Sequence, residues 1–331
     1  MIITLPATTT DEIVSVLLTQ EGAAGSSRVL TLVIDTCAAD LEDALTAAHG
    51  ASRDHPSRVV AVVAPGDPRA GAGLPGTAVP PASTAHAGHD AGGGHLDAEV
   101  RLGHHAGAGE TVVLRPFGEA ARHTDTLVVP LLLPDVPVVT WWPGPFPAVP
   151  AQAPLGRLAH ARITNTPAQA DPAAALASLV AVHTPADTDL AWTRITLWRA
   201  MVASVLDPAL RRQAVECVVV AGEPGNSSVR LMAAWLRLRL GLPVSRTDVA
   251  GIRGIASITT RTTEGDITIT RQDPDRVVIT RPGRGQPEAV TMARREPVTT
   301  LNEELRRLAP DLVYQEVLAS LEQGPGKGGP R

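Results

Sequence analysis

The sequence predicts an α/β fold for its first part and an α+β fold for its second part, and three patterns support this. Two continuous apolar runs, Val29–Ile34 and Val59–Ala64, flank a segment whose apolar residues recur with a helical period. Such runs are typical of buried parallel strands in a βαβ unit. Residues 255–281 instead alternate apolar and polar side chains between turn signals, which predicts an antiparallel meander with one solvated face.

The chain has 331 residues, which favours two domains. A proline-rich stretch over residues 144–157 is typical of a linker, so we predict a mainly parallel N-terminal domain over 1–150 and a C-terminal domain over 151–322. Residues 323–331 are predicted to be a disordered tail. Residues 65–95 are rich in Gly, Ala, Pro and His without periodicity, and we interpret them as a flexible loop.

Further elements of the first domain follow from local signals. Thr9-x-x-Glu12 is a capping box ahead of one apolar helical face. We expect strands over 96–102, 111–114 and 136–140, and a helix over 119–133.

The second domain has its own helix signals. Asp171-Pro172 predicts an N-cap followed by proline at the first helical position. A long helix is expected over 189–206, and a buried strand over 217–221 leads into another helix. Thr300-x-x-Glu303 predicts the cap of a final helical region.

The composition argues against several classes of function. The net charge is −5 with dispersed Lys and Arg, which argues against nucleic-acid binding. No apolar run is long enough for a membrane span and no signal peptide is recognisable, so we expect a soluble, cytoplasmic protein. Cys37 and Cys217 form no CxxC motif, and His86, His89, His95, His104 and His105 lie in or near a glycine-rich stretch that cannot fix metal ligands.

Sequence motifs of common enzymes are also missing. No GxGxxG fingerprint joins a strand to a helix, and no phosphate-binding GxxxxGK[ST], GxSxG or HExxH motif is present. We therefore predict no catalytic residue, no cofactor and no metal.

The segment from Gly222 to Ser228 is a candidate anion site. A strand leads through a glycine-containing turn to a helix N-terminus, where free N–H groups and the helix dipole attract anions. Gly225, Asn226, Ser227 and Ser228 could thus bind a sugar phosphate weakly. The alternative, which we favour, is an ordinary capped helix.

The helix expected from Asp189 has two distinct faces. One carries Trp192, Thr196 and Arg199 at helical spacing, and Trp and Arg are enriched in binding hot spots. These three residues are therefore candidates for a partner contact, with packing of Trp192 on the other domain as the alternative. The other face is predicted to be core and comprises Ala191, Ile195, Trp198, Val202 and Val205.

Seven segments, taken together, resemble the OpcA family of glucose-6-phosphate dehydrogenase assembly proteins. They occur in the family's order over nearly the whole chain, and WWPG with DLAWTRxTxWR is the most specific combination. Ser57 stands where the family often has Cys, so a thiol switch is not available there. The segments are RVLTLVI (Arg28–Ile34), HPSRVV (His55–Val60), VPLLLPD (Val129–Asp135), VVTWWPG (Val138–Gly144), DTDLAWTRITLWR (Asp187–Arg199), GEPGNSS (Gly222–Ser228) and ITITRQ (Ile267–Gln272).

The resemblance implies a noncatalytic partner that binds glucose-6-phosphate dehydrogenase and promotes its active oligomer in the oxidative pentose phosphate pathway. Trp141 and Trp142 of the WWPG segment then join Trp192, Thr196 and Arg199 as candidate partner-binding residues. Two alternatives stay open: a regulatory sensor that binds a sugar phosphate, and an unrecognised enzyme of α/β fold.

Overall fold

The computed structural model describes residues 1–21, 28–65, 94–103, 109–212 and 215–322. The chain divides into two compact units, Met1–Arg162 and Ile163–Arg331. The boundary predicted after residue 150 lies upstream of this division. Most of the predicted loop over 65–95, the tail over 323–331 and four of the five histidines (all but His95) lie outside the described residues.

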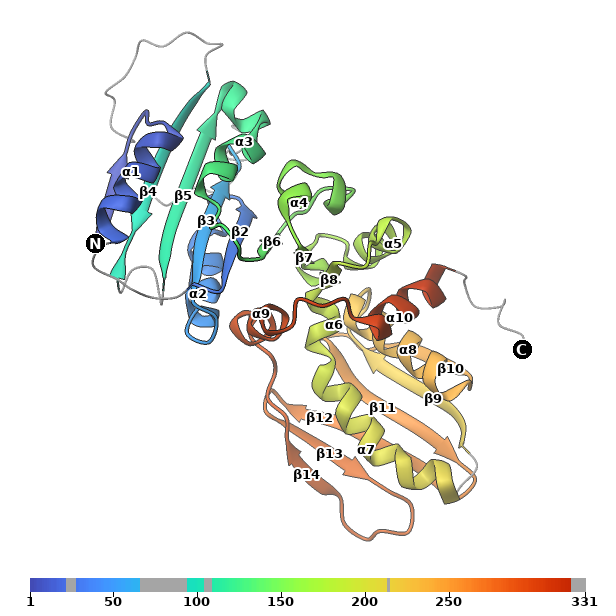
Figure 1. The fold of residues 1–331 in the computed structure, drawn as a ribbon. Coiled ribbons are helices and arrows are strands. Elements are labelled where there is room, and N and C mark those ends of the chain that lie inside the picture. Colours follow the sequence, from blue (N-terminus) through green and yellow to red (C-terminus); the bar gives the residue numbers. More distant parts are fainter. Residues whose placement is uncertain (22–27, 66–93, 104–108, 213–214, 323–331) are drawn as a thin grey trace, which may run out of the picture. The chain divides into compact units, whose positions relative to one another are not determined.

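The first unit is built on a mainly parallel sheet, which confirms the predicted fold class (Figure 1). Strand β2 pairs in parallel with β3 and β6, and β3 pairs in parallel with β5. Strands β1 and β4 add an antiparallel edge. The strand order in this unit is β1-β4-β5-β3-β2-β6-β7. The strands are β1 (Ile2–Leu5), β2 (Leu30–Thr36), β3 (Ser57–Val63), β4 (His95–Arg101), β5 (Glu110–Phe117), β6 (Val138–Trp141) and β7 (Ala161–Thr164).

The helices of the first unit confirm one prediction and correct another. The capping box is present, because the Thr9 amide donates to Glu12 Oε2 at 2.9 Å and the Glu12 amide faces Thr9 Oγ1 at 3.4 Å. The helix predicted over 119–133 was wrong as one element, because three short pieces form instead. Pro130 lacks an N–H and clashes with the preceding α-helical turn, so the α-helical piece ends at Val128. The helices are α1 (Thr10–Glu21), α2 (Leu41–Ala51), η2 (Gly118–Arg122), α3 (Thr124–Val128), η3 (Val129–Leu131), η4 (Pro150–Gln152) and α4 (Pro154–Leu158).

The second unit contains a six-stranded sheet in the order β10-β9-β11-β12-β13-β14. Strands β11 to β13 form the predicted antiparallel meander, and β14, beyond the predicted range, extends it. The edge strand β10 runs parallel to β9. The strands of this unit are β8 (Asp187–Asp189), β9 (Val215–Gly222), β10 (Val244–Asp248), β11 (Ile255–Thr262), β12 (Gly265–Asp273), β13 (Arg276–Thr280) and β14 (Glu288–Thr291).

Helices of the second unit cover this sheet, with α7 crossing its strands (Figure 1). All five residues of the predicted core face, from Ala191 to Val205, are buried. No described helix is long and apolar enough to cross a membrane. The helices are η5 (Thr166–Ala168), α5 (Pro172–Val182), α6 (Leu190–Arg194), α7 (Thr196–Arg212), α8 (Ser227–Leu240), α9 (Pro297–Arg306) and α10 (Leu312–Glu322).

Two helix predictions in this unit need correction. The helix expected over 189–206 is interrupted at Ile195, whose amide bonds the carbonyl of Trp192, three residues back. β-branched residues on both sides of this point weaken the helix. Thr300 is not a cap, because α9 begins at Pro297 and the Thr300 hydroxyl donates back to Pro297 O at 2.9 Å.

Candidate functional site

Trp192 is buried inside the second unit, where its side chain contacts Asp311, Tyr314 and Arg199. Its side chain is 2% exposed, and its indole N–H donates to Asp311 Oδ2 at 2.8 Å. The ring lies 5.4 Å from that of Tyr314 between centroids, and the guanidinium carbon of Arg199 lies 3.7 Å from its centroid. The polar face that the sequence indicated is therefore covered at Trp192 by the chain itself, and the indole at this position is not exposed.

Thr196 and Arg199 do lie beside Trp192, as their helical spacing predicted. Arg199 Nη2 donates to Thr196 Oγ1 at 3.2 Å, and the Thr196 hydroxyl donates to Glu303 Oε1 at 2.9 Å. Glu303 also forms an ion pair with Arg295. We call Trp192, Thr196, Arg199, Arg295, Glu303, Glu304 and Asp311 the Trp192 cluster. That this cluster contacts a partner stays a prediction.

Glu304 is the most strongly perturbed acid of the Trp192 cluster. Burial raises the pKa of its carboxyl group to about 7, against the lowering effect of the hydrogen bond from Thr193. Burial also lowers the pKa of the Arg199 guanidinium, although Asp311 and Glu303 favour its charge. The desolvation that causes both shifts shows that the polar groups of the cluster are shielded from water.

Asp189 carries a buried carboxylate that no sequence motif marked as functional. Asp189 is fully buried and accepts the amide of Ala191 at 2.8 Å, which makes it the N-cap of α6. It also accepts from Thr164 Oγ1 at 2.7 Å and from the Thr166 amide at 2.9 Å. Its saturated hydrogen bonding indicates a structural role.

The turn from Gly222 to Ser228 uses its polar groups internally. The side chain of Asn226 accepts the amide of Ser228 at 2.9 Å, and Gly225 takes a φ of +71°. The hydroxyl of Ser227 lies 2.8 Å from that of Thr166, and Ser228 Oγ donates to Ala191 O at 3.0 Å. The geometry favours the ordinary capped helix, and the anion site at this turn stays an untested prediction.

Glu223 adds a charge that opposes an anion at this turn. Its Oε2 atom accepts the side-chain N–H of Asn226 and the amide of Gly254, each at 2.8 Å. A carboxylate fixed beside the capping residue repels an approaching anion.

Trp141 and Trp142 belong to the core of the first unit. Their side chains are 2% and 1% exposed, and the indole N–H of Trp142 donates to Asp35 Oδ2 at 2.9 Å. A Cβ atom at Gly156 would lie 3.3 Å from Cη2 of Trp142. These residues therefore present no exposed indole to a partner, and a contact with one remains untested.

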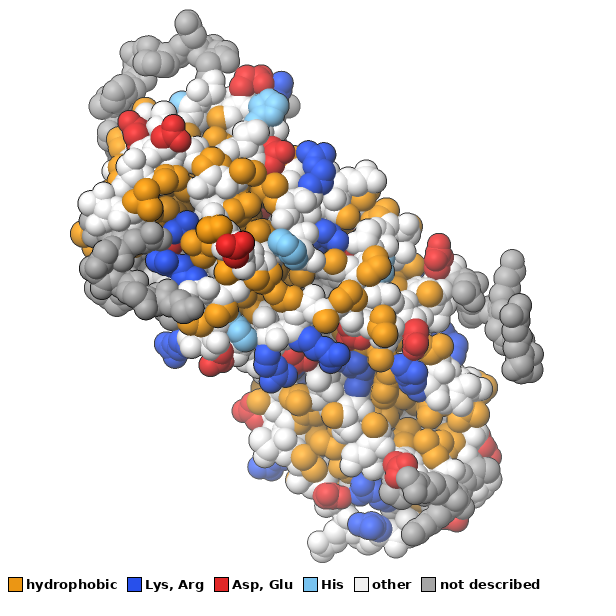
Figure 2. All heavy atoms as spheres, in the orientation of Figure 1, with side chains coloured by type: hydrophobic (Ala, Val, Ile, Leu, Met, Phe, Trp, Pro, Cys, Tyr) orange, Lys and Arg blue, Asp and Glu red, His pale blue; other side chains and the backbone are white. Residues whose placement is uncertain are grey.

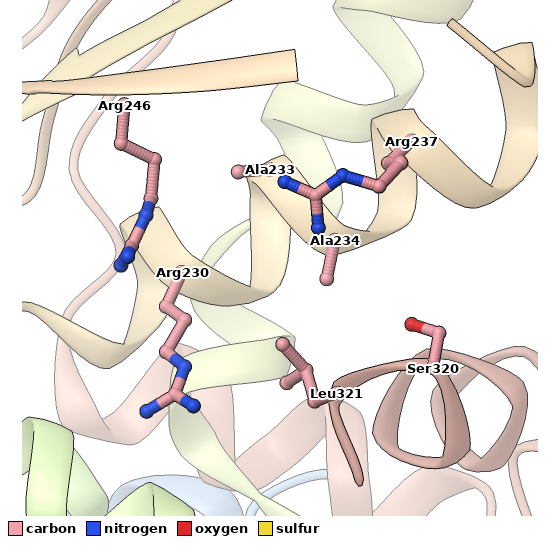
Figure 3. Close-up of a pocket in the computed structure, with 7 residues that line it drawn as sticks. All are labelled: Arg230, Ala233, Ala234, Arg237, Arg246, Ser320 and Leu321. Atoms are coloured by element: carbon pink, nitrogen blue, oxygen red, sulfur yellow. The ribbon is translucent and has the colours of Figure 1, made fainter. Parts of the chain in front are cut away.

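A small pocket in the second unit was not predicted. Its volume is about 130 Å³, and it lies where α8, β10 and α10 meet (Figure 3). No motif signals it, because its residues come from three elements. We call it the arginine pocket; its lining residues are Arg230, Ala233, Ala234, Arg237, Arg246, Ser320 and Leu321. Elsewhere in the described part of the chain, no group of three His, Cys, Asp or Glu side chains is arranged to hold a metal ion.

Hydrophobic side chains are also exposed at the surface. The face drawn in Figure 2 shows them scattered among acidic and basic groups on both units. On α7, Leu197 and Leu210 are 41% and 48% exposed, and on α8, Leu238 is 40% exposed.

Comparison with known proteins gives two family matches. Residues 48–181 match the glucose-6-phosphate dehydrogenase subunit N-terminal domain, and residues 185–318 match the C-terminal domain of the same subunit. A protein of Synechocystis sp. named "Putative OxPP cycle protein OpcA" is 30% identical in an alignment of 162 residues that covers 45% of this chain and 33% of that protein. The match thus spans about a third of that relative's length.

A solved structure with a distant likeness is an oxidoreductase from Sinorhizobium meliloti. It is 12% identical, with 90% of this chain and 87% of that chain covered. Its TM-score of 0.42 is too low to support a conclusion about fold or chemistry.

Proposed function

We propose that this chain, which belongs to the OpcA family of glucose-6-phosphate dehydrogenase subunits, binds that dehydrogenase and promotes its active oligomer without catalysing a reaction itself. The observation that carries the proposal is the presence of both family domains, in order, over residues 48–181 and 185–318. Family membership supports a role in the oxidative pentose phosphate pathway.

The polar groups of the Trp192 cluster support a noncatalytic role. Glu303 is engaged by Thr196 and Arg295, and Asp311 by the indole of Trp192. Acid and base catalysts must reach a substrate, whereas these groups bond each other. A binding protein of this kind acts through differential affinity: it must bind the active form of the dehydrogenase more tightly than the inactive form.

We place the contact on the exposed part of α7. Leu197 is exposed there, directly after Thr196 in the sequence, and an exposed apolar side chain on a helix suits a protein interface. Trp192 would act from beneath this surface by fixing the guanidinium of Arg199. Trp141 and Trp142, which are buried, would contribute indirectly, by stabilising the core of the first unit.

The decisive experiment measures the dehydrogenase of the same cell with and without this chain. We expect faster NADP reduction at limiting dehydrogenase, and a shift toward the larger oligomer in light scattering. The chain alone should not reduce NADP with glucose 6-phosphate. Unchanged activity and unchanged oligomeric state would overturn the proposal, and turnover by the chain alone would favour the enzyme alternative.

A pair of matched variants tests the proposed surface. Leu197→Glu places a charge on the exposed side of α7, whereas Leu238→Glu makes the same change at an equally exposed leucine of α8. We expect only Leu197→Glu to weaken activation, at least tenfold in the concentration required. Equal effects of the two variants would remove α7 from the interface.

A further inference from the structure

Three arginines converge on the arginine pocket from two elements. Arg230 and Arg237 lie two turns apart on α8, so they share a helical face. Arg246 lies on the edge strand β10, two residues after Val244, which is buried in the core with residues of α8. Because side chains of a strand alternate, Arg246 leaves β10 on the same side as Val244. Figure 3 shows the side chains of all three around one space.

The space between them exists because the helix is lined with small residues at this point. Ala233 and Ala234 lie on α8 between the two arginines, and each has only a methyl group there. Ser320 and Leu321 of α10 form the facing wall. The volume of about 130 Å³ compares with about 30 Å³ per water molecule in the liquid. A group of a few heavy atoms therefore fits.

The charges in this pocket are unbalanced. Among the described residues, none of the three arginines forms an ion pair with a carboxylate. Arg237 Nη2 donates to Val244 O at 3.0 Å and Arg230 Nη1 to Ala173 O at 3.4 Å, so both have only backbone oxygens as partners. Burial, and then the charge of Arg246, lower the pKa of Arg230, which shows that two of the cations repel each other.

Another arginine of the same helix has a carboxylate partner. Arg239 forms an ion pair with Glu316 of α10 at 2.9 Å, on the exposed surface. α10 thus supplies a carboxylate to Arg239, while its residues at the pocket are a serine and a leucine. α10 therefore offers no carboxylate where it lines the pocket.

We propose that the arginine pocket binds a phosphate group, either inorganic phosphate or the phosphate of a small monoester. Guanidinium groups offer several N–H donors in a planar fork that matches phosphate oxygens, and charge-assisted hydrogen bonds of this kind are strong. An anion between the three cations attracts each of them and thereby offsets their mutual repulsion. The site is distinct from the turn at Gly225–Ser228, and no other assigned role uses its residues.

The test uses the full chain alone in phosphate-free buffer at constant ionic strength. Inorganic phosphate and glycerol 3-phosphate are titrated separately by calorimetry, and the melting temperature is followed in parallel. We expect saturable binding with a higher melting temperature, since a ligand that binds only the folded state stabilises it. Tighter binding of glycerol 3-phosphate would identify a monoester as the ligand class, and equal binding would identify phosphate itself.

Variants locate the site. The double variant Arg230→Gln with Arg246→Gln should raise the Kd at least tenfold, whereas the matched control Arg239→Gln should leave it within twofold. If the double variant does not fold, the single variant Arg246→Gln, at an exposed position of the edge strand, serves in its place. Absence of binding, unchanged binding in the pocket variants, or an equal loss in the control would overturn the proposal. Because no dehydrogenase is present, this result is independent of the proposed activation.

Discussion

The Trp192 cluster and the arginine pocket lie in the same unit, but their arginine side chains have different partners. In the Trp192 cluster, Arg199 stacks on the indole of Trp192 and Arg295 pairs with Glu303. In the pocket, Arg230, Arg237 and Arg246 share one space, and no described carboxylate pairs with any of them. Arginines matched by the chain's own groups stabilise the fold, whereas arginines left without anions are suited to bind an external one.

The largest effect that tests this comparison is the loss of the indole at position 192. Trp192→Ala should lower the free energy of unfolding by about 3–5 kcal/mol, because it leaves a cavity beside Tyr314 and an unpaired Asp311. Urea denaturation measures it, with Trp235→Ala, at a partly buried tryptophan of α8, as the milder control. A cost below about 1 kcal/mol would show that the Trp192 cluster is not structural.

A second test addresses the polar network beneath the cluster. Asp189→Ala should cost about 3 kcal/mol, since the buried donors of Thr164, Thr166 and Ala191 lose their acceptor. Chemical denaturation provides the measurement. Asp266→Ala, at an exposed aspartate of β12, should change stability by no more than about 0.5 kcal/mol. Equal costs would mean that the network contributes little.

The third test is the pH dependence that Glu304 imposes. Its pKa in the folded chain is about 7 against an ordinary value of 4.5, so the folded state binds its proton more tightly than the unfolded state does. Its contribution is fully present below pH 4.5 and is lost as the pH rises to 7. The loss is on the order of 3 kcal/mol, because the pKa rises from 4.5 to about 7 and one pKa unit corresponds to about 1.4 kcal/mol.

The variant Glu304→Gln isolates this effect. Asp35, in the other unit, has a pKa raised by burial and contributes with the same sign, so the wild type alone does not assign the slope. The difference in unfolding free energy between wild type and Glu304→Gln should therefore vary between pH 4.5 and 7. A difference that is constant over this range would contradict the proton uptake by Glu304.

Much of the fold followed from the sequence because the signals were local. The strands Leu30–Thr36 and Ser57–Val63 are almost wholly buried, as the apolar runs Val29–Ile34 and Val59–Ala64 predicted. The alternating pattern of β11 to β13 similarly predicted the meander. The edge strand β10 was missed because four of its five residues are exposed and no alternation marks it.

The candidate sites were harder to predict because distant segments create them. Helical spacing correctly grouped Trp192, Thr196 and Arg199, but it could not show that α9 and α10, more than a hundred residues later, cover that face. The arginine pocket likewise needs α8, β10 and α10 together. The period of the side-chain pattern predicts which residues share a face of a helix or strand. Which of these faces is exposed depends on tertiary contacts.

The smallest expected effect on stability is that of Arg246→Gln, and comparing it with Arg199→Gln distinguishes the arginine pocket from the Trp192 cluster. In phosphate-free buffer, Arg246→Gln should leave the unfolding free energy within about 0.5 kcal/mol of wild type or slightly raise it, because it removes a cation that repels Arg230. Arg199→Gln should instead destabilise the chain, by about 1–2 kcal/mol, since it removes the cation stacked on Trp192. Added phosphate should then stabilise wild type and Arg199→Gln more than Arg246→Gln. If Arg246→Gln were as costly as Arg199→Gln without phosphate, the pocket arginines would be structural after all, and the distinction between the two regions would fail.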